Sequence, residues 1–200
     1  MHKTGDVGAD CNTTVKALEM FGVPPDKYWP YTDITLDFDK EPLSYWDAFR
    51  HCFKVVSCDK LATPGISNDD LLTRIKMNLA AEWPLMFAFM AYRSTTRASS
   101  SGKISFPCPK DEVMGGMAVA AVGYDDTIKI ESECESPTTG AILFAISWGS
   151  QWGDNGYGWL AYDFVLKART VDWWALKKPN GSIKASLKII QVNTEINSLH

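Results

Sequence analysis

The chain has 200 residues, of which 46% are hydrophobic, and this is enough to bury the core of one domain or of a compact pair of subdomains. The formal net charge is −4 and no run of five basic residues occurs, so charge gives no reason to expect binding to nucleic acid. No apolar stretch reaches the roughly 18 residues of a membrane span and no signal peptide is visible, which favours a soluble, cytoplasmic protein without a membrane partner.

A helix is predicted near the start of the chain. It begins at a capping residue, Asp10 or Asn12, and ends at Gly22, which two prolines follow closely. Its apolar side chains recur on one face: Val15, Leu18 and Phe21. This face requires a partner surface to bury it.

The next segment has weaker patterns and then a clear helix. Residues 27–33 are aromatic and predict an ordered loop, residues 44–53 a short helix, and residues 53–57 a strand. Ser67 and Asp70 form a capping box, and the helix that follows ends before a Trp-Pro pair. Its apolar residues have helical spacing: Leu71, Leu72, Ile75 and Leu79.

Strands dominate the rest of the chain. A buried strand is predicted at residues 85–92 and a polar loop, rich in serine, at residues 94–102. Three further strands, separated by Gly and Asp turns, are expected at residues 117–124, 141–148 and 157–162. Their predicted core comprises Val119, Val122, Leu143, Ile146 and Trp148. Helices followed by an antiparallel sheet indicate the α+β class.

The chain closes with a predicted hairpin. Residues 171–176 and 183–192 flank a Lys-Lys-Pro-Asn-Gly-Ser turn signal. The apolar residues of the second segment alternate as in a half-buried strand, although a helical spacing also fits them. We favour the strand.

The cysteines are five in number: Cys11, Cys52, Cys58, Cys108 and Cys134. An odd number, without CxxC pairs or metal-type histidine spacing, argues against a disulfide framework and against a zinc site. We therefore expect free thiols, most of them buried as small hydrophobic residues, and neither a metal nor a cofactor.

Three segments together resemble the papain-like cysteine peptidase family. Residues 115–126 (Gly-Gly-Met-Ala-Val-Ala-Ala-Val-Gly-Tyr-Asp-Asp) are similar to the family strand that reads Gly-Gly-His-Ala-Val and ends in Gly-Tyr. Residues 146–158 (Ile-Ser-Trp-Gly-Ser-Gln-Trp-Gly-Asp-Asn-Gly-Tyr-Gly) resemble the Asn-Ser-Trp-Gly motif and its continuation. Residues 28–31 (Tyr-Trp-Pro-Tyr) are similar to a loop of microbial members.

The resemblance implies a papain-like domain at residues 8–178. Its helical part, about residues 8–52 and truncated relative to the family, would pack on an antiparallel β-barrel-like part at about residues 53–178, with a cleft between them. Residues 179–200 lie outside the resemblance, and we expect them to form an extension with an extra strand.

The resemblance also implies that the family's chemistry is missing. Cysteine peptidases need a thiolate, a histidine that moves protons and a group that orients the imidazole. Met117 stands at the histidine position and Ile146 at the asparagine position, and no Cys-Gly-Ser-Cys-Trp motif of the nucleophile is found. The flanking motif residues remain: Gly115, Gly116, Ser147, Trp148, Gly149 and Trp152. Trp148 and Trp152 are expected to cover the barrel strands, and no catalytic residue is predicted.

Other candidate sites are weaker than their structural alternatives. His51 and Cys52 form a poor dyad because neighbouring helical residues point about 100° apart, and Cys11 reads as a packed residue at a helix start. The acidic residues around Cys134, which are Glu131, Glu133 and Glu135, could collect a cation but more readily form a solvated loop. The Asp125-Asp126 pair is expected in a turn.

Three functions remain open at this point. The first is a non-catalytic pseudopeptidase that binds a peptide or protein in the residual cleft. The second is a structural or assembly subunit, and the third is a hydrolase that acts through unfamiliar residues or with a partner chain. A helical part without its usual filling would expose apolar surface, so we expect a homo-oligomer or a partner chain, through that face or through the C-terminal strand.

Overall fold

The computed structural model describes residues 10–25, 27–29, 44–53, 57–134 and 136–177. The helices are α1 (Cys11–Phe21), α2 (Tyr45–Arg50), α3 (Asn68–Ala80), α4 (Arg93–Arg97) and α5 (Asp163–Leu166). The strands are β1 (Ser57–Lys60), β2 (Leu85–Tyr92), β3 (Lys103–Ile104), β4 (Val113–Ile130), β5 (Thr138–Ala145), β6 (Tyr157–Ala161) and β7 (Thr170–Lys177). None of the helices in these ranges has the length and apolar content needed to span a bilayer.

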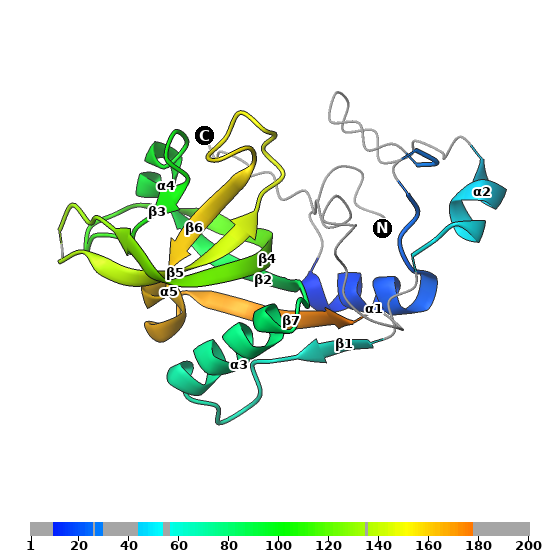
Figure 1. Ribbon diagram of the computed structural model, residues 1–200, viewed down its shortest axis with the longest axis horizontal. Helices are drawn as coiled ribbons and strands as arrows, with labels where there is room; N and C mark the ends of the chain where they lie inside the picture. The colour runs from blue at the N-terminus through cyan, green and yellow to red at the C-terminus, as the bar shows by residue number, and fades with distance from the viewer. Residues whose placement is uncertain (1–9, 26, 30–43, 54–56, 135, 178–200) are drawn as a thin grey trace, which may run out of the picture.

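The strands form one curved sheet in the order β1-β7-β2-β4-β5-β6-β3. All its neighbouring pairs are antiparallel except β3 with β6, which run parallel. Figure 1 shows the sheet on one side of the molecule and α1 and α2 on the other, with α2 far from β3 and β6. The α+β class is confirmed, and the sheet is mixed because of the short parallel pair.

The core lies on the inner face of the sheet, under α3 and α5. Strand β2 places alternate residues on this face, and its Phe89 pairs with Met117 of β4. Trp173 of β7 stacks on Phe87 with ring centroids 4.0 Å apart, and its indole N–H donates to Thr170 Oγ1 at 2.9 Å. Burying the polar atom of Trp173 is tolerated because it has this partner.

Two of the predicted helices are capped as their sequences indicate. Asp10 accepts hydrogen bonds from the backbone N–H groups of the first turn of α1, and Gly22 ends that helix with a positive φ of 75°. Ser67 Oγ accepts from the N–H of Asp70 at 3.1 Å and starts α3. Of the two caps considered for α1, Asp10 is therefore the one used.

Hydrogen bonds connect α1 to the segment after α2 and to the edge of the sheet. Val23, just after α1, and Phe53, just after α2, exchange backbone hydrogen bonds of 3.0 and 2.8 Å. Glu19 of α1 accepts from the N–H of Cys58 at 2.6 Å and so caps an exposed donor on edge strand β1.

Several sequence predictions are wrong in detail. Residues 94–102 are not simply a loop, because α4 occupies the first part of this segment. The Asp125-Asp126 pair lies inside the long strand β4, at a register irregularity, and not in a turn after it. In the predicted core, Val119 and Ile146 are buried, but Val122 and Leu143 are only half-buried and Trp148 is 39% exposed.

Other predictions fall outside the described residues. These are the strand at residues 183–192, the extension at 179–200, residues 30–33 of the aromatic loop and most of the strand at 53–57. The division of the domain near residue 52 remains a prediction.

Candidate functional site

The two positions expected to carry the histidine and the asparagine lie in the core of the sheet. Met117 on β4 is 2% exposed and Ile146, just after β5, is 6% exposed. Both belong to one cluster of aliphatic and aromatic side chains. The N–H of Ile146 donates to the carbonyl of Gly156 at 3.0 Å, which closes the loop of residues 147–156.

The tryptophans of this loop have different surroundings. Trp152 is 6% exposed and its ring lies 5.9 Å from that of Phe144 on β5. Trp148 meets Trp152 edge to face at 5.7 Å but stays partly exposed. The expectation that both tryptophans cover the strands is therefore right for Trp152 and wrong for Trp148, because Trp152 occupies the space next to the sheet.

The glycines of the motif are required by close packing. A Cβ on Gly158 would lie 2.8 Å from the carbonyl oxygen of Gly102 and equally near Phe144 and Trp152. A Cβ on Gly153, whose φ is +56°, would lie 2.3 Å from the carbonyl of Tyr157. The string Trp-Gly-Asp-Asn-Gly-Tyr-Gly is thus explained by backbone segments that approach closely.

The other motif residues frame Met117 and Ile146 without adding a reactive group. Gly116 lies on β4 opposite Met90 of β2, and nothing lies within 4 Å of the position of its absent Cβ. Gly115 pairs with Ala91. Ser147 is half-buried and Gly149 has a φ of +83° in the exposed start of the loop.

The cysteine prediction is wrong for one pair. Cys108 and Cys134 form a disulfide, with Cα atoms 5.8 Å apart, although 26 positions separate them in the sequence. The prediction holds for Cys11, Cys52 and Cys58, which are free and half-buried. The reason for the error is that an odd count excludes only a complete pairing, and the fold brings two distant loops together.

The free thiols of Cys11 and Cys58 are poor nucleophiles. Burial, with the nearby Glu19 carboxylate, raises the pKa of Cys58 to about 12. Burial also raises the pKa of Cys11, with a contribution from Asp172. Since the thiolate is the attacking species, neither group is activated.

The His51–Cys52 pair does not form a dyad. His51 Nδ1 lies 2.9 Å from the carbonyl oxygen of Asp47, and its ring stacks on Tyr28 at 4.7 Å. The thiol of Cys52 donates to the carbonyl of Ala48 at 3.2 Å. Each side chain is thus engaged with its own turn of backbone.

Of the acidic groups considered as a cation site, Glu133 pairs with an arginine. Glu133 accepts from Arg97 at 2.8 Å, and within the described ranges no cluster of three potential metal ligands occurs. Glu135 lies outside those ranges.

A polar cluster that the sequence did not reveal joins α3 to the sheet. Lys76 and the hydroxyl of Tyr162 both donate to Asp126 Oδ1, at 2.6 and 2.9 Å, and the ammonium of Lys76 lies over the rings of Tyr162 and Tyr124. The hydrogen bonds from Lys76 and Tyr162 hold the pKa of Asp126 below its ordinary value. We interpret this cluster as a structural contact between α3 and the sheet, because the Lys76 ammonium already occupies the position next to the Asp126 carboxylate.

Comparison with known proteins agrees with this architecture. A family profile described as "Papain family cysteine protease" matches residues 8–168. A peptidase C1-like protein of Acanthamoeba polyphaga mimivirus is 26% identical over 176 residues, covering 86% of this chain and 53% of that protein.

Among solved structures, xylellain, a cysteine protease of Xylella fastidiosa, is similar with a TM-score of 0.68 and 28% identity, covering 90% of this chain and 65% of that one. A cysteine protease of Carica candamarcensis in complex with E-64 has a TM-score of 0.55 and 18% identity, covering 83% and 67%. The chain spans about half the length of the curated relative it matches. It belongs to the papain family of cysteine proteases.

Proposed function

We propose that this chain is a non-catalytic member of the papain family that binds a peptide or protein segment. The observation that carries the proposal is the burial of two apolar side chains, Met117 and Ile146, where the family resemblance expects a histidine and an asparagine. Neither side chain can accept or donate the proton that acyl transfer requires.

The surroundings of these positions support the same conclusion. Among the described residues, the buried polar side chains are Thr95 and Thr170, and both hydroxyls already accept hydrogen bonds, from the N–H of Tyr92 and the indole of Trp173. No Asp, Glu, His, Lys, Arg or Cys residue among those described is buried, and the buried ionisable residues are Tyr92 and Tyr162. No side chain of the imidazole kind therefore stands in for the histidine inside the described part of the sheet. A longer protein with a reactive cysteine elsewhere would still have Met117 and Ile146 here.

The outer face of β2 and β4 is the surface on which we place the bound segment. Met90 is 38% exposed there, and its neighbour Gly116 leaves open space. This face is opposite to Met117 because side chains alternate along a strand. We place an extended segment beside Met90, over the open space at Gly116.

The test combines turnover with binding. We expect no hydrolysis of a broad fluorogenic peptide library, and saturable binding of a subset of its unlabelled peptides, measured by fluorescence polarisation. Gly116→Phe should abolish binding by filling the open space, whereas Met77→Phe, at an exposed position of α3, should leave binding unchanged.

Two results would contradict the proposal. Hydrolysis of the library would favour a hydrolase that uses unfamiliar residues. Absence of binding by any peptide, or binding that persists in Gly116→Phe, would remove the proposed surface.

An assembly role is the second candidate, and exposed apolar side chains of the helical part support it. Met20 and Phe21 of α1 and Trp46 and Phe49 of α2 are all more than half exposed. Two large exposed apolar side chains on each of these helices favour contact with a partner. Light scattering across a dilution series should then show association that weakens when Trp46 and Phe49 are both changed to Ser, and a monomer at every concentration would exclude self-assembly.

A further inference from the structure

Two loops and a helix meet around the disulfide. Cys108 lies in the loop between β3 and β4, and Cys134 lies in the loop between β4 and β5. Their Cα separation of 5.8 Å is within the usual range for a disulfide. The bond therefore joins the two loops that flank the long strand β4.

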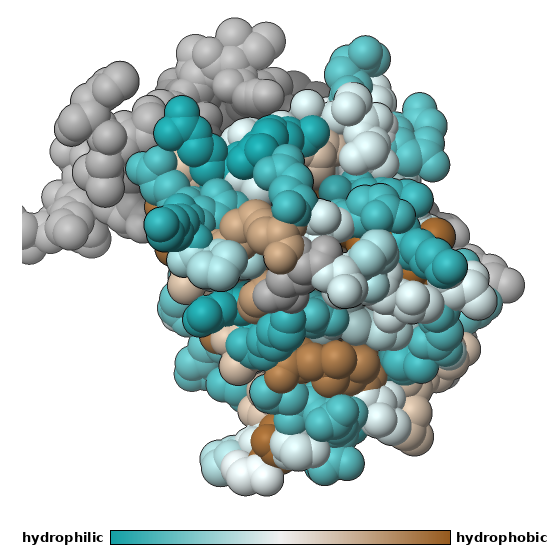
Figure 2. Space-filling model, turned by 90° about the vertical axis from the view of Figure 1, so that its left-hand side faces the viewer, coloured by the Kyte–Doolittle hydropathy of each residue, from teal (hydrophilic) through white to brown (hydrophobic). Residues whose placement is uncertain are grey.

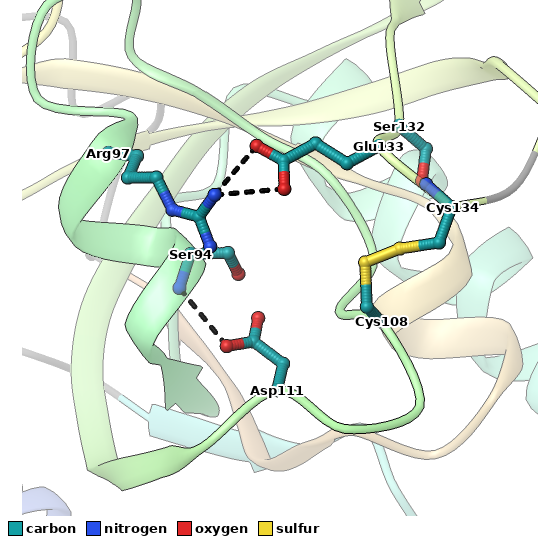
Figure 3. The surroundings of a disulfide bond; sticks show 7 residues. All are labelled: Ser94, Arg97, Cys108, Asp111, Ser132, Glu133 and Cys134. Carbon is teal, nitrogen blue, oxygen red and sulfur yellow. Dashed lines mark hydrogen bonds and ion pairs between the residues drawn. A yellow bond between two sulfur atoms is a disulfide. The ribbon is translucent and has the colours of Figure 1, made fainter.

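Helix α4 is attached to both loops beside this bond. Arg97 Nη1 donates to both carboxylate oxygens of Glu133 at 2.8 Å, and Glu133 is the neighbour of Cys134. The N–H of Ser94 donates to Asp111 Oδ1 at 3.4 Å, in the loop of Cys108. Figure 3 shows Arg97 and Ser94 on one helix, facing Glu133 and Asp111 on either side of the disulfide.

The segment after α4 is hydrogen-bonded to residues of, and just after, the loop of residues 147–156, which we call the tryptophan loop. The N–H of Gly153 donates to the carbonyl of Ser99 at 2.7 Å, and the N–H of Trp159 donates to the carbonyl of Gly102 at 2.7 Å. The N–H of Gly102 in turn donates to the carbonyl of Ala98, at the end of α4. A continuous path of hydrogen bonds thus runs from the disulfide loops through α4 to residues 147–158.

We propose that Cys108–Cys134 is a reversible redox latch for this path. In the oxidised state the disulfide holds the two loops, α4 is ordered between them, and residues 98–102 keep the tryptophan loop closed beside Ile146. In the reduced state α4 loosens, and the loop of residues 147–156 loses its support. The inference does not depend on whether the chain is catalytic.

At its start, α4 keeps two bonds after reduction, from the Arg93 N–H to the Glu112 carbonyl at 2.9 Å and from the Tyr92 N–H to Thr95 Oγ1 at 3.1 Å. The side-chain contacts closer to the disulfide are weak. The side chains of Arg97 and Glu133 are both mostly exposed, so their ion pair adds little and is screened by salt. The bond from Ser94 to Asp111 is long for a hydrogen bond. Because α4 has only five residues, it cannot persist on its own propensity.

The chemistry is thiol–disulfide exchange with a dithiol as the electron donor. Cys134 is exposed and Cys108 is half-buried, so the incoming thiolate attacks the sulfur of Cys134 and the sulfur of Cys108 leaves as a thiolate, which takes up a proton. The second thiol of the donor then displaces Cys134 and closes the donor's own disulfide. Two electrons and two protons pass to the protein, and a disulfide such as oxidised glutathione reverses the exchange.

The first experiment counts thiols. The full chain, purified without reductant and treated with oxidised glutathione, is denatured and alkylated with iodoacetamide before and after reduction. Mass spectrometry should find three alkylated cysteines before reduction and five after it. Five before reduction would overturn the proposal.

The second experiment measures hydrogen exchange of the native chain in oxidised glutathione and in dithiothreitol. Reduction should speed exchange at least tenfold at residues 93–102 and 147–158, with no change in α3. It should also lower the Tm by roughly 6 to 12 °C. Unchanged exchange in both segments would show that the disulfide is no latch, even if the Tm falls.

Matched variants separate the latch from general effects of reductant. The double variant Cys108→Ser, Cys134→Ser should show the hydrogen exchange of the reduced protein in either buffer. The control Cys52→Ser removes a free thiol of the helical part, and its hydrogen exchange should respond to dithiothreitol as that of the natural chain does. A double variant that still responds to dithiothreitol would contradict the proposal. If this variant does not fold, the comparison of the two redox states of the natural chain decides alone.

Discussion

The sheet and the helical part of this chain bury their apolar side chains to different extents. Strands β2, β4, β5, β6 and β7, with α3 and α5, form a cluster whose members cover one another. Helices α1 and α2 each bury a single residue, Val15 and Ala48. Figure 2, which looks onto the sheet side, shows hydrophilic residues around small apolar patches, whereas α1 and α2 carry exposed Met20 and Trp46.

This difference indicates where the free energy of folding comes from. Interior residues that touch many neighbours stabilise a fold, and exposed apolar residues contribute little until a partner covers them. The sheet can therefore maintain its structure from its own contacts, while the helical part offers surface for binding or assembly.

Removal of a core indole should give the largest effect. Trp173→Ala should reduce the free energy of unfolding by about 3–5 kcal/mol, because it opens a cavity beside Phe87 and leaves the Thr170 hydroxyl without its partner. The matched control Trp46→Ala, at a site that is 73% exposed, should stay within about 0.5 kcal/mol. Urea denaturation followed by circular dichroism measures the free energy of unfolding of both variants. Equal losses of stability would contradict the difference between the two regions.

A methyl group in the tryptophan motif should have the next largest effect. Gly158→Ala should cost about 2–3 kcal/mol, because the new Cβ would meet the carbonyl of Gly102 and two aromatic rings at once. Gly116→Ala, where open space surrounds the new group, should change stability by less than about 1 kcal/mol. The same denaturation experiment applies, and a neutral Gly158→Ala would show that this packing is looser than the structure indicates.

Restoring the family's histidine should destabilise the sheet and give no activity. Met117→His places a polar ring in an apolar site and should cost about 1–3 kcal/mol. Met77→His, on the exposed face of α3, should be nearly neutral. Unchanged stability together with new peptide hydrolysis would refute both parts of this prediction.

The smallest effect concerns the polar cluster between α3 and the sheet. Asp126→Asn should cost less than about 1 kcal/mol near neutral pH, since the carboxylate is exposed and its bonds to Lys76 and Tyr162 are solvated. The pKa of Asp126 is lowered in the folded state, so its stabilising contribution is present above the unfolded value of 3.8 and disappears as the pH falls below it. Denaturation near neutral pH and at about pH 3 should show the difference between variant and natural chain shrinking in acid.

Local signals in the sequence were sufficient for the regular elements. The capping residues Asp10 and Ser67 and the apolar spacing of α3 predict those helices, because such interactions involve neighbours in the chain. Strands β2, β5 and β6 follow from apolar runs between turns. The family motifs located Met117 and Ile146, but only the fold shows that both are buried.

The features that were missed depend on distant contacts. Helix α4 has the sequence Arg-Ser-Thr-Thr-Arg, which has little helical propensity, and it is held by Asp111 and Glu133 from two other loops. The disulfide of Cys108 and Cys134 arises because β4 and β5 bring the two loops together. The exposure of Trp148 could not be read from its motif, since only packing decides which of two tryptophans occupies the space at Phe144.

The central claim, that this papain-family chain lacks the family's chemistry, is tested most directly with E-64, the inhibitor bound in the Carica candamarcensis structure. The full chain is incubated with excess inhibitor at neutral pH, and its intact mass is measured. We predict no adduct, because the pKa values of Cys11 and Cys58 are raised. The remaining free thiol, Cys52, donates to the carbonyl of Ala48, and its neighbour His51 contacts the carbonyl of Asp47. One adduct per chain on a single cysteine, lost when that cysteine is changed to Ser, would contradict the account.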